Sequence, residues 1–183
     1  MATYPVLDRQ TALDRLRRPF PGSFFVEEEE AHPWRVRRRQ VFREPLLRAW
    51  DSRSGSQPED DGFMRSRAPE MRLDDRESRR NSLSIHFDYQ NWTPTPYISF
   101  TTSASRVEDL VARRINKRRG QMITVIDPNI RVQNGLPILD AKAEMDHYEI
   151  KDPYGEYGQY YYDEYLCLWQ VTAAETVGHC GHI

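Results

Sequence analysis

The segment Thr95–Arg114, with the sequence TPYISFTTSASRVEDLVARR, changes from a strand pattern to a helix pattern. Its first part, Tyr97–Thr101, is rich in aromatic and β-branched residues, which is typical of a strand. Three successive hydroxyl side chains follow, on Thr101, Thr102 and Ser103. One of them is expected to cap the next helix, because a hydroxyl oxygen accepts hydrogen bonds from the free amides of a first turn. Capping uses one hydroxyl, so it stays open whether the cluster also holds a ligand.

The helix that follows has one apolar stripe and a basic end. Its apolar residues fall at i, i+3, i+4 and i+8, the spacing of one helical face; they are Val107, Leu110, Val111 and Ile115. Lys117–Arg119 then places cations at the negative end of the helix dipole, and Gly120 can adopt a left-handed conformation. A helix end therefore explains this basic cluster without nucleic acid.

Length and composition limit the classes of protein that are possible. The 183 residues fit one domain, or one domain with a tail. A net charge of −2 argues against a general attraction to nucleic acid or to an anionic membrane. Two cysteines are too few for a disulfide scaffold, and no signal core or run of about 18 apolar residues is present. We expect a cytoplasmic protein that binds neither membranes nor nucleic acid.

The remaining patterns predict an α+β fold with a mixed or antiparallel sheet. Residues 1–40 are expected to be an arm, packed on the domain or partly disordered, and residues 41–183 are expected to be the domain. Asp51–Arg80 is predicted to be a long loop. The predicted strands are Pro45–Trp50, Ser84–Tyr89, Tyr97–Thr101, Met122–Ile126 and Tyr165–Val171, and further helices are predicted over Thr11–Arg18, Ile138–Met145 and Thr172–Glu175.

Two charged residues stand out in apolar strands. Arg48 lies within LLRAW, where an arginine needs a partner or a cleft, and its planar fork suits a carboxylate or a phosphate. Glu164 is the last polar residue before the apolar run YLCLW, so its carboxylate can be held rigidly for charge stabilisation or base chemistry. Each residue can also be a solvent-facing position of its strand. No metal site is expected, because His179–His182 lacks a second pair of ligands.

In their order along the chain, these residues resemble the Arg-Ser-Glu class of ADP-ribosyltransferases, particularly the family of the heat-labile enterotoxin A chain. LLRAWDSRSGSQPEDDGF is similar to that family's arginine strand and the segment after it, YISFTTS to its Ser-Thr-Ser strand, and YYDEYLCLW to its glutamate strand. Over roughly residues 42 to 182 the chain also resembles an uncharacterised domain of filamentous fungi, and that overall resemblance is the closer of the two.

The resemblance to the transferases implies a split sheet with a cleft that binds NAD as a substrate. Arg48 is then expected to contact the NAD phosphates, and Glu164 to act as the catalytic carboxylate that stabilises the positive charge formed as nicotinamide leaves. The cluster of Thr101, Thr102 and Ser103 is expected to stiffen the cleft and to bond Glu164 or the ribose. His86 and Tyr97 are expected to line the pocket.

Two positions depart from the family pattern. Tyr162 stands where the family often has a Glu or Gln that activates the acceptor, which puts transfer to a protein arginine in doubt. Asp163 is the catalytic carboxylate if the register is shifted by one residue. The sequence therefore leaves two functions open on this fold: an NAD-cleaving ADP-ribosyltransferase or glycohydrolase with an unknown macromolecular acceptor, or an inert binding module. A nucleic-acid-binding domain built on the basic runs is a third, less favoured alternative.

Overall fold

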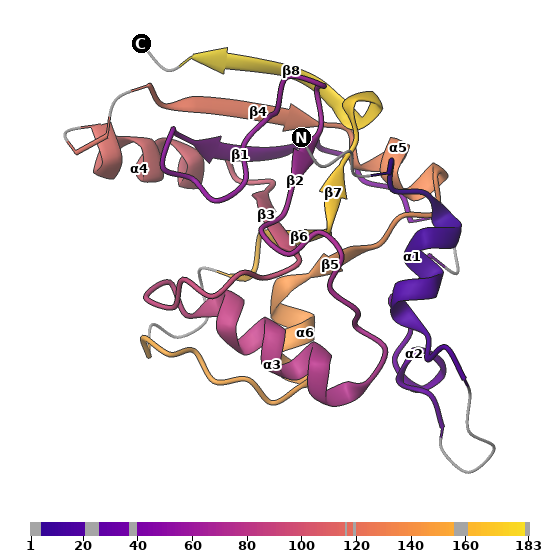
Figure 1. Cartoon of the computed structure of the whole chain (residues 1–183). Helices are drawn as coiled ribbons and strands as arrows, with labels where there is room; N and C mark the ends of the chain where they lie inside the picture. The colour runs from indigo at the N-terminus through magenta and orange to yellow at the C-terminus, as the bar shows by residue number, and fades with distance from the viewer. Residues whose placement is uncertain are drawn as a thin grey trace.

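A six-stranded antiparallel sheet lies at the centre of the computed structural model, which describes residues 5–20, 26–36, 40–115, 117–118, 120–155 and 161–181 (Figure 1). Its strands are β1 (Leu46–Trp50), β3 (Tyr97–Thr101), β4 (Met122–Ile126), β5 (Ile138–Asp140), β6 (Glu164–Leu168) and β8 (Thr176–Gly181). Their spatial order is β5-β6-β3-β1-β4-β8. A second, two-stranded sheet pairs β2 (Met64–Arg65) with β7 (Gln170–Val171). The α+β class is confirmed, and every pairing among the described strands is antiparallel.

The large sheet splits between β1 and β3. β1 pairs with β4 along its whole length, whereas its pairing with β3 is limited to Leu47 opposite Thr101. The two strands diverge beyond that point, which leaves β8, β4 and β1 as one half of the sheet and β3, β6 and β5 as the other (Figure 1). The split matters for function because it opens a space between two central strands.

The helices cover the two halves separately. They are α1 (Arg9–Leu16), α2 (Glu28–Ala31), α3 (Arg76–Phe87), α4 (Ala104–Ile115), α5 (Pro128–Gln133) and α6 (Ala141–His147), followed by a 3-10 turn at Ala173–Glu175. α4 packs Val107 and Val111 against Ala49 of β1. α3 and α6 lie beside the other half (Figure 1) and contribute to its core through Leu83, Phe87 and Met145. No helix in the described part of the chain is long and apolar enough to cross a membrane.

The predicted strand at Ser84–Tyr89 is wrong, because residues up to Phe87 belong to α3. Asp75 caps the start of the helix, because its side chain accepts from the amide of Ser78 at 2.7 Å. Its buried residues are Arg79, Ser82, Leu83 and Phe87, a helical spacing in which two of the four side chains are polar. Apolar residues therefore mark only part of the buried face of α3. The predicted loop Asp51–Arg80 is correspondingly shorter, since it contains β2 and the first turn of α3.

Two predicted elements in the second half also differ from the structure. The expected helix Ile138–Met145 is a strand, β5, followed by α6. The expected strand Tyr165–Val171 is interrupted at Trp169, whose positive φ of 61° turns the chain from β6 into β7. Two elements were not predicted. α5 begins at Pro128, with Asp127 as its cap, and β8 pairs with β4 as an edge strand.

The described part of the N-terminal arm belongs to the core. Leu7, Ala12, Leu16 and Trp34 are buried in the same cluster as Leu83 of α3. Glu29 of α2 is fully buried and forms an ion pair with Arg79 of α3, with 2.6 Å between Glu29 Oε2 and the guanidinium. Arg79 also donates to the backbone carbonyls of Leu16, His32 and Leu73. One buried arginine thus joins both arm helices to the domain.

Candidate functional site

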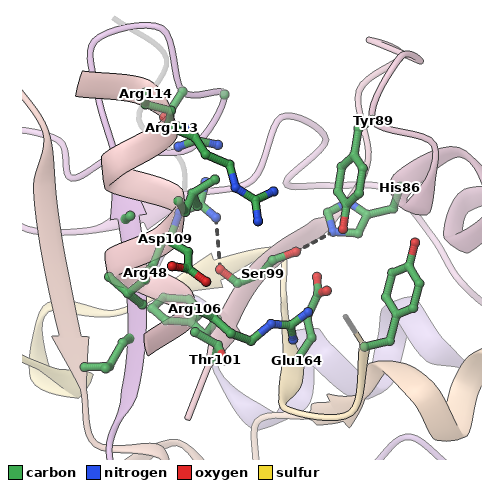
Figure 2. A pocket seen from close by; sticks show the side chains of 18 of the residues that line it. Arg48, His86, Tyr89, Ser99, Thr101, Arg106, Asp109, Arg113, Arg114 and Glu164 are labelled. Atoms are coloured by element: carbon green, nitrogen blue, oxygen red, sulfur yellow. Dashed lines mark hydrogen bonds between the residues drawn. The ribbon is translucent and has the colours of Figure 1, made fainter. Parts of the chain in front are cut away.

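A cleft of about 790 Å³ lies at the split between β1 and β3, and α4 forms one of its walls (Figure 2). Its volume is within the range of small-molecule sites, about 300–1,000 Å³. The lining is strongly cationic in a chain whose net charge is −2. It contains the arginines Arg48, Arg53, Arg106, Arg113, Arg114 and Arg118 and the carboxylates Asp109, Asp152 and Glu164. This imbalance favours an anionic ligand.

At the split, the backbone carbonyl of Ser99 is not used in the ladder between β3 and β6. The amide of Trp169 donates to the Pro96 carbonyl at 2.6 Å, and the amide of Thr102 donates to the Asp163 carbonyl at 3.2 Å. Hydrogen-bonded pairs alternate along an antiparallel ladder. Ser99 is therefore a residue whose backbone groups point away from β6, towards the diverging β1.

Arg48 fills the opening between the two strands. Its guanidinium donates to the carbonyl of Ser99 at 2.9 Å (Figure 2) and to that of Ser56 at 3.1 Å. Its Nε is buried and has no hydrogen-bond partner among the described residues. Burial, together with the nearby charge of Arg114, lowers the pKa of Arg48 to about 10. Arg48 is thus a fixed cation that keeps donors available, which suits a bidentate oxyanion such as phosphate.

Glu164 stands directly across from Thr101 in the β3–β6 ladder, so the two side chains share the cleft face. Ser99 is on the same face, two residues away from Thr101. Burial raises the pKa of Glu164, while a hydrogen bond from Ser99 and the charges of Arg106 and Arg48 oppose that rise. Figure 2 shows the Arg106 guanidinium beside the Glu164 carboxylate. The site therefore presents one partly desolvated carboxylate within a cationic cleft.

A hydrogen-bonded chain leads from α3 to Glu164. His86 Nδ1 lies 2.9 Å from the Thr95 hydroxyl, and His86 Nε2 lies 2.8 Å from the Ser99 hydroxyl. Burial and the charge of Arg48 lower the pKa of His86 to about 3, so the ring is neutral at pH 7. When Glu164 is ionised its carboxylate only accepts, so the Ser99 hydroxyl then donates to Glu164 and accepts from His86 Nε2–H. Thr95 then donates to Nδ1. The chain fixes both the tautomer of His86 and the orientation of Glu164.

We predict that His86 makes stability depend on pH. Its pKa in the folded state, about 3, is below the ordinary value of 6.5, so between these values the unfolded chain binds a proton that the folded chain does not. The contribution is fully present above pH 6.5 and is lost as the pH falls towards 3. Relative to His86→Gln, the wild type is expected to lose about 2–3 kcal/mol of unfolding free energy between about pH 7 and pH 4.5.

Urea unfolding at both pH values, combined with an NMR titration of the imidazole, measures this effect. Equal losses in the wild type and in His86→Gln, or an imidazole that gains its proton near pH 6.5, would contradict the prediction.

The three expected hydroxyls have separate roles. Ser103 caps α4, since its hydroxyl accepts from the amide of Arg106 at 3.4 Å. The Thr101 hydroxyl accepts from the amide of Ser103 at 3.1 Å, and Thr101 also lines the cleft. Thr102 is not part of the lining. The serine that contacts both Arg48 and His86 is Ser99, which was not predicted; it reads in sequence as an ordinary polar position of an alternating strand.

The aromatic lining also differs from expectation. Tyr97 is buried outside the cleft, where its hydroxyl is 2.8 Å from that of Ser82. Tyr89 and Tyr161 line the cleft instead, and a hydrogen bond joins their hydroxyls. Tyr89 also stacks on Tyr154, with ring centroids 5.7 Å apart. Such faces can stack on an aromatic ligand.

The alternative carboxylate Asp163, the acceptor position Tyr162 and the metal-ligand candidate His179 all lie outside the cleft. Asp163 and Tyr162 are exposed and absent from the lining, and the Tyr162 ring is 5.7 Å from Lys142 Nζ. His179 lies on β8, where its Nδ1 is 2.8 Å from the Thr124 hydroxyl. No group of three potential metal ligands occurs among the residues that the structure describes.

Comparison with known proteins identifies a family for this chain. A family model described as "Domain of unknown function (DUF7587)" matches residues 42–181, a range that includes every strand of the large sheet. No curated protein matches the chain.

Proposed function

The chain belongs to the DUF7587 family, and we propose that it binds NAD in this cleft and cleaves the bond between nicotinamide and ribose. The observation that carries the proposal is the convergence of Arg48, Ser99 and Glu164 from three adjacent strands on one cleft. The order of these residues in the chain resembles the Arg-Ser-Glu arrangement of the ADP-ribosyltransferases, with Ser99 in the place expected for Thr101.

The proposed reaction uses the charges of the cleft in two places. Arg48 and Arg106 hold the pyrophosphate, which places the nicotinamide riboside next to Glu164 and the tyrosines Tyr89 and Tyr161. The C1′–N bond breaks, its electron pair stays on the ring nitrogen, and nicotinamide leaves as a neutral molecule. The Glu164 carboxylate stabilises the positive charge that develops on C1′ and on the ring oxygen.

The acceptor then forms a bond to C1′ and releases a proton to solvent. Water gives ADP-ribose, and a nucleophile on a macromolecule gives an ADP-ribosylated product. Tyr162 offers no carboxylate to activate a guanidinium, and it points its ring towards Lys142 outside the cleft. This favours water, or an acceptor other than a protein arginine, as the partner of the reaction.

Incubation of the purified protein with NAD tests the proposal. Free nicotinamide, measured by chromatography, is expected to accumulate above a blank without protein. Failure to release nicotinamide, under conditions in which calorimetry detects NAD binding, would instead support the inert binding module. The exposed Tyr162 at the acceptor position is the observation that favours this second function.

A further inference from the structure

One face of α4 presents cations to the cleft at two levels. Arg106 and Arg113 are seven residues apart, so they lie on the same face with a rise of about 10 Å between them. Val107 and Val111 bury the opposite side of the helix against β1. Figure 2 shows the Arg106 side chain next to Glu164, and that of Arg113 reaching into the cleft farther along. Arg114 lines the cleft at the same far level.

The arginines at the far level have no carboxylate of their own. No ion pair among the described residues joins Arg113 or Arg114 to an acidic side chain. The buried Asp51 is the nearby acid, but its Oδ1 accepts from the amide of Arg53 and its Oδ2 accepts from Arg118 and Gln121. The acceptor groups of Asp51 are therefore already used. Asp109, one turn before Arg113 on α4, also lines the cleft, and no ion pair among the described residues joins the two.

Like charges are also crowded here. Burial lowers the pKa of Arg114; the charge of Asp51 opposes this shift, and the charge of Arg118 adds to it. Arg114 in turn lowers the pKa of Arg48. An anion bound between these groups would relieve the repulsion, and arginine forks match the geometry of phosphate oxygens.

We infer that Arg113 and Arg114 form a second anion subsite, which selects a dinucleotide carrying a phosphomonoester on its adenosine ribose, as in NADP, over NAD. The inference rests on the proposed function for its orientation: with the scissile bond at Glu164 and the pyrophosphate at Arg48 and Arg106, the adenosine ribose reaches the far level of α4. Arginine at that position is a general solution for binding a 2′-phosphate.

Binding of ligands without a scissile bond tests the subsite separately from catalysis. Calorimetry at low salt compares adenosine 2′,5′-bisphosphate, adenosine 5′-monophosphate and inorganic phosphate. The wild type is expected to bind the bisphosphate about ten-fold or more tightly than the monophosphate. The variant Arg113→Gln/Arg114→Gln should lose that preference, whereas Arg43→Gln, at an exposed position outside the cleft, should keep it. Thermal melts confirm that both variants are folded.

Each outcome decides one point. Equal affinity of the wild type for the two nucleotides, or a preference that survives in the double variant, would overturn the subsite. So would binding of inorganic phosphate as tight as that of the bisphosphate, because the subsite would then recognise free phosphate. A retained bisphosphate preference without nicotinamide release from NAD or NADP would reject the proposed reaction and leave the subsite standing. Equal nicotinamide release from NAD and NADP would support the proposed reaction and reject the subsite.

Discussion

Glu164→Gln is expected to reduce nicotinamide release from NAD by about 10²–10³-fold, a loss of about 3–4 kcal/mol of transition-state stabilisation. The amide keeps the size of the side chain and can still accept a hydrogen bond from Ser99. It carries no negative charge, so it cannot stabilise the oxocarbenium-like ribose. In NAD itself the positive charge is on the nicotinamide ring and not on the ribose, so the affinity for NAD, measured by calorimetry, is expected to change only a few-fold.

Asp163→Asn is the matched control, because it removes the neighbouring carboxylate from an exposed position outside the cleft. Its rate of nicotinamide release should be that of the wild type. Full activity in Glu164→Gln together with loss in Asp163→Asn would show that the adjacent residue is the functional acid. Equal activity in all three proteins would remove the carboxylate from the mechanism.

Arg131→Met is expected to destabilise the fold by about 3–5 kcal/mol. Arg131 is fully buried, and it donates to Glu175 at 2.9 Å and to the carbonyls of Pro137, Leu168 and Gln170. The carbonyls of Leu168 and Gln170 flank the turn from β6 into β7. Methionine fills much of the volume, but it leaves these carbonyls without the guanidinium donor and the Glu175 carboxylate without its counter-charge.

Urea denaturation of Arg131→Met measures the loss, and Arg43→Met, at an exposed position, should stay within about 0.5 kcal/mol of the wild type. The double variant Arg131→Met/Glu175→Leu should be more stable than Arg131→Met, because it no longer buries an unpaired carboxylate. It should remain less stable than the wild type, since the carbonyls stay unsatisfied. A single variant as stable as the wild type would mean that water replaces the guanidinium.

The parts of the fold that follow apolar periodicity could be predicted from sequence. The strand and helix of Thr95–Arg114 are examples, because their buried faces consist of apolar residues at regular spacing. α3 could not be recognised in the same way. Its buried stripe includes Arg79 and Ser82, and Arg79 is tolerated in the core through Glu29, a partner fifty residues away. A burial pattern that depends on a distant charge leaves no local signal.

The residues of the site also fall into those that the sequence could predict and those that it could not. Arg48 and Glu164 stand out because each is a charge in an apolar strand, and both line the cleft. Ser99 lies between Ile98 and Phe100 like any outward-facing residue, and its contact with His86 becomes visible only once α3 is placed against β3. A cluster of hydroxyl residues is easy to notice in a sequence, but the register of strand pairing determines which hydroxyl lies next to a carboxylate.

The buried pair of Glu29 and Arg79 has a practical consequence for where this protein can be cut. The family match starts at residue 42, which invites expression of a shorter chain from that point. Such a chain would lose the apolar cover from Leu7 to Trp34 and would strand the Arg79 guanidinium inside the core with no counter-charge. The core thus extends beyond the stretch matched by the family model, and a chain used in assays should keep the arm residues that pack into it.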